Sequence, residues 1–589
     1  MSEIFNLDKS VKNLGKINLK AEEYEYLRKR TKVFPYVCSK KWVAQLYSKE
    51  EKYQLEVFST GMVVKERLIN TDNAIVKLKI QYYDGLAERE KEFDSSILTV
   101  LGVKVLFNYG IRFSEDDMER VVRYLLKSEA IATISRSYSK LGWDKEGETD
   151  IFKSHRAISQ DGVVPNLSYG GSLELKPEGS IDIWLSMVKK EVLPSVPMTV
   201  VMLLGFASPV LALLNQKYDV GAMMFNLSNN TSKGKTTSAM LATSVFSNPV
   251  LNRGCTISFN ATENALIQFI SECQGHTVVI DEVGTSNCSN FTRLMYTICN
   301  GRSKMRLNGD STQKVVKAFS SVVISTAEFD LVNDDTPNGI KARVFEIKDS
   351  FTSSAENSDH IKKCIIENHG VAGERFMHIL INKSSDVFYD YEKDKELLCF
   401  KCENKKELSA RICSKLAVIV TTARYVNEAL NLKINIKKII EYMLKLERQI
   451  ISDSQPEERL IEIVRQEVSR NNSRFKIDNA PTPSLCSGAI ITDDNYSEIQ
   501  ITESEFNSII KAYQVSGWKN ILKKLKANGI LITEQGHLYK RITLFKEIGR
   551  QKCYCFKVEN EMPQKENEPK DKLIEELDDD IFADLKLED

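Results

Sequence analysis

A run of small and polar residues that follows an apolar segment has the composition of a phosphate-binding loop. The segment VGAMMFNLSNNTSKGKTTSAM begins at Val220 and gives way to the sequence GKTT. In such loops, backbone N–H groups and the positive end of the following helix hold phosphates, a lysine neutralises their charge and a hydroxyl binds Mg²⁺. We therefore predict that Lys235 contacts phosphate and that Thr236 binds the metal. The residues expected around the nucleotide in this loop are Asn229, Ser232, Lys233, Gly234, Lys235, Thr236 and Thr237.

The loop departs from the common pattern GxxxxGK[ST] at one position, where Asn229 replaces the first glycine. Asparagine tolerates the left-handed backbone conformation better than most residues. We therefore expect Asn229 to stand in for that glycine, so that the departure weakens the pattern without abolishing it.

Polar residues beside three later apolar runs complete the set that a nucleotide hydrolase needs. The run TVVI leads into Asp281 and Glu282, which suit Mg²⁺ binding through water and activation of the attacking water, respectively. The run SSVVIST contains Thr326, which we expect to sense the γ-phosphate, and Arg343 precedes the short run VFEI. Together with the loop, these residues predict an α/β core that uses ATP and Mg²⁺.

Length and composition are those of a soluble protein with several domains. At 589 residues, the chain exceeds what one hydrophobic core holds. Residues 559–589 contain 13 Asp and Glu against 4 Lys, so the tail is acidic and the rest mildly basic. Twelve scattered cysteines and the lack of a secretion signal favour a cytoplasmic location. Residues 193–214 are uncharged, but their three prolines favour a buried helical element over a membrane span.

Basic residues in two later segments suit contact with DNA. In SKMRLNGDSTQKVVKAF, Asn308-Gly309 predicts a hairpin beside the sensor run, and ATP turnover would move it on DNA. The alternative is an edge hairpin with solvated lysines. After residue 500, two helical patterns and a strand pair predict a winged helix, although small winged helices also bind proteins. The basic residues expected to contact DNA are Lys304, Arg306, Lys314, Lys523, Lys524, Lys540 and Arg541.

These motifs together resemble a known family. GKTT, VVIDE, the NGRSKMR…NGD hairpin and ARVFEI are similar to the AAA+ core of the pre-sensor II insert clade, which includes the minichromosome maintenance helicases. From about residue 30 to 450, the chain resembles the self-loading replication-initiator helicases of staphylococcal cassette chromosome-type mobile elements. Thr326 departs from this pattern, because many relatives have asparagine there.

The resemblance implies a hexameric ring that loads on DNA and unwinds it from 3′ to 5′, with the hairpin of residues 304–317 lining the channel. Arg343 would then act on the ATP of the neighbouring subunit. Arg411 would be the sensor beside a helical lid, with Arg424 of the same predicted helix as its competitor.

We expect an α/β AAA+ P-loop ATPase core with a helical lid, N-terminal α+β domains and a C-terminal winged helix. The expected segments are an N-terminal mostly-β domain (1–110), a second N-terminal subdomain (111–190), the AAA+ ATPase core (191–350), the helical lid (351–450), a linker (451–500), the winged-helix domain (501–558) and an acidic disordered tail (559–589).

The expected function is ATP-dependent DNA unwinding in replication initiation of a mobile genetic element. The expected partners are single-stranded and forked DNA, five further copies of the chain, and a single-strand-binding protein or another replication partner, without a membrane. The rival interpretation is an AAA+ protein-remodelling or signalling ATPase that does not unwind DNA. A second rival is a DNA-binding regulator with an inactive phosphate loop.

Overall fold

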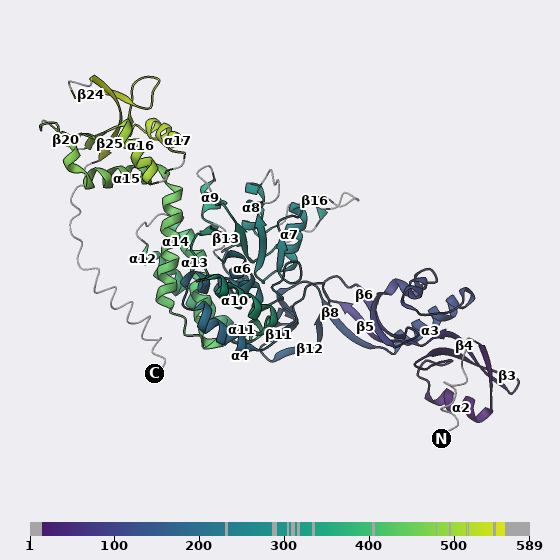
Figure 1. Ribbon diagram of the computed structural model, residues 1–589. Coiled ribbons are helices and arrows are strands. Elements are labelled where there is room, and N and C mark those ends of the chain that lie inside the picture. The colour runs from purple at the N-terminus through teal and green to yellow at the C-terminus, as the bar shows by residue number, and fades with distance from the viewer. Residues whose placement is uncertain are drawn as a thin grey trace. The chain divides into compact units, whose positions relative to one another are not determined.

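The computed structural model consists of two compact units. It describes residues 15–559 except 230–233, 285–290, 303–305, 308–312, 315–317, 333–335, 403–406, 479, 494–495, 514, 516 and 546–548. The first unit extends from the N-terminal end to Val332 and includes Gly339–Glu447. The second consists mainly of the chain from Arg448 onward. Figure 1 shows the labelled helices and strands of both.

The N-terminal strands form a small antiparallel sheet. Its strands are β1 (Gly15–Leu19), β2 (Tyr36–Cys38), β3 (Trp42–Lys49) and β4 (Lys52–Thr60), in the order β1-β4-β3-β2. Helix α2 (Ala21–Arg30) packs its Tyr24 into a cluster with Trp42 and Leu55 of this sheet. The expected mostly-β character of the first segment agrees with this arrangement.

An eight-stranded sheet follows and crosses the predicted boundary at residue 110. Its order is β7-β6-β5-β8-β12-β11-β10-β9, and β5 pairs in parallel with β8. Helix α3 (Met118–Ala130) is amphipathic and packs against β5. The strands are β5 (Met62–Asn70), β6 (Val76–Tyr83), β7 (Glu88–Asp94), β8 (Thr133–Tyr138), β9 (Gly142–Glu146), β10 (Thr149–Lys153), β11 (Arg156–Ser159) and β12 (Gly162–Tyr169).

The second half of this sheet shares a hydrophobic core with the sheet that carries the phosphate loop. Tyr138, Ile151 and Leu167 are buried in the same cluster as Met224 and Val323. Residues 111–190 are therefore not a separate subdomain. The strand pattern of the sequence shows which residues are apolar but not which distant cluster they join.

The central sheet is parallel and has five strands. The order β14-β15-β18-β13-β19 places β18 between the strand of the phosphate loop and the strand of the carboxylates. Both faces are covered, as the continuous apolar runs predict. The strands are β13 (Met223–Ser228), β14 (Thr256–Ser258), β15 (Val278–Val283), β18 (Val322–Ala327) and β19 (Val344–Ile347). The helices α6 (Lys235–Ser244), α7 (Glu263–Glu272) and α8 (Phe291–Cys299) surround this sheet (Figure 1).

The apolar segment before this sheet forms the buried helix α5 (Val196–Leu214). Within the described ranges, α5 is the only helix whose length and hydropathy would suit a membrane span, and 89% of its most apolar stretch is buried. It packs against α6 and β18. The prediction of a buried helical element is confirmed.

Helices follow the central sheet, as the predicted lid requires. They are α10 (Ala355–Glu367), α11 (Val371–Asn382), α12 (Ser384–Lys401), α13 (Glu407–Leu430) and α14 (Ile436–Ser454). The buried Lys415 of α13 donates hydrogen bonds to the backbone carbonyls of Val220 and Ala222, just before β13. Helix α13 is therefore anchored to the segment that leads into β13.

The second unit combines helices with a six-stranded sheet and contains the segment that we predicted as a linker. Leu460 of α15 lies in one core cluster with Phe506, Leu522 and Phe556. The prediction of a linker at 451–500 is wrong because its apolar residues pack into this core. The elements are α15 (Pro456–Arg470), β20 (Phe475–Ile477), β21 (Gly488–Thr492), β22 (Tyr496–Thr502), α16 (Glu503–Ala512), α17 (Trp518–Ala527), β23 (Leu531–Ile532), β24 (Lys540–Phe545) and β25 (Gly549–Glu559).

Candidate nucleotide site

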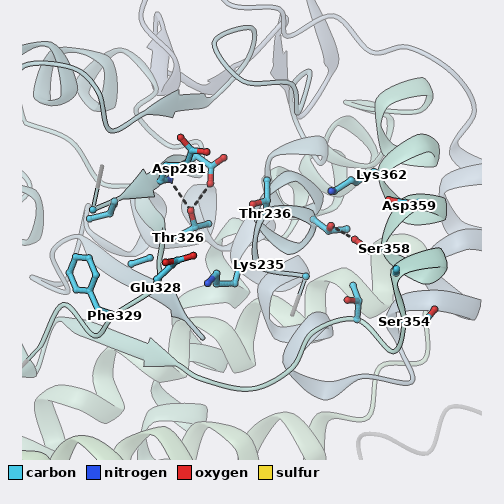
Figure 2. Close-up of a pocket in the computed structure, with 18 residues that line it drawn as sticks. Lys235, Thr236, Asp281, Thr326, Glu328, Phe329, Ser354, Ser358, Asp359 and Lys362 are labelled. Atoms are coloured by element: carbon cyan, nitrogen blue, oxygen red, sulfur yellow. Dashed lines mark hydrogen bonds between the residues drawn. The ribbon is translucent and has the colours of Figure 1, made fainter. Parts of the chain in front are cut away.

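A cavity of about 670 Å³ lies where the strands β13, β15 and β18 end. It contains seven of the residues that the sequence predicts: Gly234, Lys235, Thr236, Thr237, Asp281, Glu282 and Thr326. In Figure 2, Asp281 and Thr326 lie on one side of the cavity and the α10 residues on the other, with Lys235 and Thr236 between them. Ser232 and Lys233, also predicted here, lie outside the described residues.

Gly234 lets the phosphate loop approach the segment that leads to the lid. It has a φ of +82° directly before α6, and a Cβ there would be 2.5 Å from Oγ1 of Thr352. Only glycine combines this backbone conformation with such a close contact. The amino end of α6, with its unpaired N–H groups, therefore opens into the cavity.

The three residues after Gly234 have different roles. Lys235 donates a hydrogen bond from Nζ to the backbone carbonyl of Asn229, at the start of the loop. Thr236 is exposed in the cavity, whereas Thr237 is buried and its Oγ1 lies 2.6 Å from Oγ of Ser358 on α10. Thr236 is thus the hydroxyl available to a metal ion, and Thr237 joins α6 to the lid.

Asn229 contributes to the structure here through the hydrogen bonds of its side chain, and its backbone does not adopt the conformation typical of glycine. Its φ is not positive, so the expected left-handed conformation is wrong. The side-chain amide instead donates to the backbone carbonyls of Lys348 and Asp349, at 2.7 and 3.1 Å. The Asp349 carboxylate accepts hydrogen bonds from Tyr442 and Lys445 of α14. Asn229 therefore ties the start of the phosphate loop to the segment that leads into the lid.

A bulge presents the two carboxylates to the cavity. The pairing of β15 with β18 shifts register between Ile280 and Val283, and Glu282 has a φ of 62°. Such irregularities are common next to active sites, where they redirect a side chain. Oγ1 of Thr326 accepts the Glu282 backbone N–H at 3.0 Å and donates to Oδ1 of Asp281. Thr326 therefore holds the carboxylate of Asp281 and the backbone of Glu282.

A buried carboxyl group below the cavity was not predicted from the sequence. Glu346 of β19 accepts hydrogen bonds from the Asn226 side chain, the Ser228 hydroxyl and the backbone N–H groups of Leu331 and Val332. Burial, together with the nearby Asp330, raises the pKa of Glu346 to about 7, although these hydrogen bonds oppose the shift. The group holds the chain after β18 against β13. An isolated Glu in VFEI gives no sign of this role.

Arg343 lies at the opposite edge of the sheet from the cavity. Its backbone carbonyl accepts the Met224 N–H at the amino ends of β13 and β19, and its side chain donates to Asn300 at 3.1 Å. Since all five strands are parallel, the phosphate loop is at the other end of β13. Arg343 therefore does not line the cavity of its own chain.

The arginines that we expected to act as a lid sensor do not line the cavity either. Arg411 is exposed on α13 and forms an ion pair with Glu407. Its competitor Arg424 pairs with the buried Asp394 at 2.8 Å. Among the described residues, the lid cation that lines the cavity is Lys362 of α10. Helical spacing alone does not show which face of a lid helix meets the nucleotide.

Comparisons with known proteins agree with this architecture. One family model, described as a domain of unknown function (DUF927), matches residues 34–318, and another, described as a Cch helix turn helix domain, matches residues 456–561. A solved structure described as "SCCmec type IV Cch - active helicase" is 23% identical, with a TM-score of 0.64 over 90% of this chain and 98% of that chain. At this identity the likeness concerns the fold. No curated protein matches the chain.

The helix turn helix match covers the described elements of the second unit from α15 to β25. It starts at the first residue of α15 and extends just past β25. The match therefore includes most of the segment that we predicted as a linker. The elements α16, α17 and the β24–β25 pair follow in the expected order of helix, helix and hairpin.

The two strands of the predicted hairpin before β18 are present and paired. Arg306 of β16 (Arg306–Leu307) pairs with Lys314 of β17 (Gln313–Lys314), and Leu307 pairs with Gln313. The predicted turn residues Asn308 and Gly309 lie outside the described residues. Cross-strand partners share one face of a ribbon, which places two basic positions side by side. Lys304 lies outside the described residues.

Most of the predicted DNA contacts in the second unit are paired with carboxylates. Lys524 lies 2.9 Å from Glu457, Lys540 lies 3.9 Å from Glu498 and Arg541 lies 3.4 Å from Glu534. The basic side chains are all at least 41% exposed, and exposed pairs of this kind contribute little to stability. Phosphates are therefore able to replace these carboxylates as partners. Lys523 is exposed and forms no ion pair with a described residue.

Proposed function

We propose that this protein is an ATP-driven DNA helicase that acts in replication of a mobile genetic element. The observation that carries the proposal is the meeting of Lys235, Thr236, Asp281 and Glu282 in one cavity at the carboxyl edge of a parallel sheet. The sequence match to a helix turn helix domain supports a DNA partner. The fold shared with a structure described as an active helicase supports unwinding as the output.

In this proposal, each residue of the cavity has one task in ATP hydrolysis. Lys235 exchanges the Asn229 carbonyl for the phosphates, and the amino end of α6 donates its N–H groups to them. Glu282 accepts a proton from the attacking water, while Thr326 holds Asp281 and the Glu282 backbone in place. One hydroxyl from Thr236 and one carboxylate from Asp281 are oxygen ligands of the kind that Mg²⁺ prefers. Bound there, Mg²⁺ would offset the charge that develops on the phosphates.

Arg343 supports an oligomeric enzyme. It lies at the opposite sheet edge from its own cavity, so any contact of Arg343 with ATP has to involve a neighbouring copy. We propose that six copies form a ring in which Arg343 of one subunit completes the site of the next, as the resemblance to AAA+ helicases implies. The proposed direction of movement, from 3′ to 5′, also rests on that resemblance.

The DNA contacts proposed are the hairpin around Arg306 and Lys314 and the C-terminal unit, which we interpret as a winged helix. The hairpin precedes β18, and Thr326 lies near the other end of this strand, so β18 connects the hairpin to the cavity. Basic ribbons that move relative to phosphates give salt-dependent DNA binding. Protein remodelling remains the second candidate, because a lid and a cavity of this kind do not require DNA.

ATPase assays with and without single-stranded DNA distinguish these two candidates. We expect wild-type protein to hydrolyse ATP and single-stranded DNA to raise the rate several-fold, whereas Lys235→Ala hydrolyses none under either condition. Hydrolysis that single-stranded DNA does not change would favour the protein remodeller. Absence of hydrolysis in the wild type would contradict both candidates and favour a DNA-binding regulator.

A further inference from the structure

Helix α10 presents a polar face to the nucleotide cavity. Ser354 caps its amino end, and Ser358 and Lys362 follow at intervals of four residues. Side chains at this spacing lie on one face of a helix, about one turn apart. All three line the cavity, together with Asp359 (Figure 2).

Contacts on both sides fix this face in place. Ser358 meets Thr237 of α6 at 2.6 Å, and Asn357 donates to Glu191 in the turn before α5. Ile361 and Ile365 are fully buried on the adjacent face of α10. The helix is therefore a preorganised wall of the cavity, since neither its rotation nor its translation is free.

Lys362 is the half-buried cation on this wall, and it has no ion pair or hydrogen bond with any described residue. Its ammonium is therefore available to an anionic group that enters the cavity. In Figure 2 the amine of Lys362 points into the cavity toward Thr236. The described lining holds only one other cation, Lys235, which lies across the cavity.

The carboxylates that line the cavity increase the importance of a second cation for binding phosphates. Asp281, Glu282, Glu328 and Asp359 line the same space, and each repels the phosphate chain of a nucleotide. The phosphates are thus drawn to the two lysines and the amino end of α6. One cation from the core and one from the lid face the phosphates from different sides.

We propose that Lys362 is a phosphate-binding residue that the lid contributes to the nucleotide site of its own subunit. This inference rests on the proposed function, since it assigns a further contact to the same ATP. It takes the place of the sensor role that the sequence suggested for Arg411. A charge-assisted hydrogen bond of this kind changes affinity by about tenfold.

Nucleotide binding by the full-length chain tests this inference, with Glu282→Gln as background to suppress hydrolysis. The Kd of a fluorescent ATP analogue with Mg²⁺ is measured for Lys362→Ala, Lys362→Arg and Lys363→Ala. Lys363 is the matched control, because it is the next residue of α10 but is exposed and lines a separate hollow with α4 (Ile181–Met187). We expect Kd to rise about tenfold in Lys362→Ala, to be restored to within about threefold by arginine and to stay unchanged in Lys363→Ala.

Two further readouts separate a phosphate contact from a structural role. Because Lys362→Ala loses one ionic contact, its Kd should depend less on salt concentration than that of its background. The thermal unfolding midpoint of the nucleotide-free variant should equal that of the background. Equal Kd values for Lys362→Ala and Lys363→Ala would overturn the inference. The proposed function fails separately, if Lys235→Ala binds the analogue as tightly as its background does.

Discussion

Thr326 uses one hydroxyl group to hold two carboxylate residues. It accepts the backbone N–H of Glu282 and donates to the side chain of Asp281. From the sequence we expected Thr326 to sense the γ-phosphate. Its proton is donated to Asp281, so we propose that its effect on ATP passes through the two acidic residues.

Replacement of Thr326 by valine removes both hydrogen bonds and keeps the shape of the side chain. We expect kcat for ATP hydrolysis to fall by about ten- to a hundredfold, because hydrogen bonds to charged groups are worth about 1.5–3 kcal/mol. KM should change by less than about threefold. Thr326→Ser is the matched control and should retain most of the rate. A large rise in KM with an unchanged kcat would instead indicate direct phosphate binding.

At the scale of the element, Glu346 of β19 holds the chain after β18 against β13. Its neutral form is favoured in the folded protein, since burial raises its pKa from 4.5 to about 7. Between these values the folded protein keeps a proton that the unfolded chain has lost. The associated stability is therefore fully present below pH 4.5 and is lost as pH rises to about 7.

Glu346→Gln tests this linkage, because glutamine stays neutral at every pH. We expect the free energy of unfolding of the first unit, wild type minus variant, to fall by about 3 kcal/mol between pH 4.5 and 7. Chemical unfolding at a series of pH values measures the difference. The comparison with the variant cancels the pH-dependent contributions of other groups to stability. One such group is the buried His276, whose pKa is lowered to about 4. Parallel curves for the two proteins would contradict a neutral Glu346.

The basic hairpin β16–β17 is the element that we expect to transmit hydrolysis to DNA. Lys304→Ala combined with Lys314→Ala should keep the basal ATPase rate and abolish unwinding, since we expect both lysines to contact DNA and not the nucleotide. Lys189→Ala with Lys190→Ala, two exposed lysines before α5, is the control and should leave unwinding intact. Unwinding by the hairpin variant at the wild-type rate would make these lysines ordinary surface charges.

The sequence predicted those parts of the site that local composition determines. GKTT comes after an apolar strand, and the Asp281-Glu282 pair and Thr326 lie near the carboxyl ends of two others. Parallel strands bring their carboxyl ends to one edge of the sheet. The side-chain bonds of Asn229, the burial of Glu346 and the cavity contact of Lys362 depend on segments more than 100 residues away. The predicted linker failed for the same reason, because its apolar residues pack against α16 and α17, which come later in the chain.

At the scale of the whole molecule, we propose that Arg343 of one copy completes the site of another, because it lies at the opposite sheet edge from its own cavity. Arg343→Ala alone should bind ATP and lose hydrolysis by about a thousandfold or more. Lys235→Ala alone should also be inactive. Mixed subunits of the two variants should recover part of the rate, because some interfaces combine an intact phosphate loop with an intact Arg343. Absence of any recovery, with mixed oligomers formed, would contradict action in trans.

The central claim is that ATP hydrolysis at this cavity drives the separation of DNA strands. It is tested most directly by strand displacement on a forked duplex with ATP and Mg²⁺, comparing wild type with Glu282→Gln. We predict that the wild type releases the strand, and that Glu282→Gln binds ATP and the fork but releases none. If the wild type hydrolyses ATP on the same substrate without releasing a strand, or if Glu282→Gln unwinds as fast as the wild type, the helicase assignment is wrong.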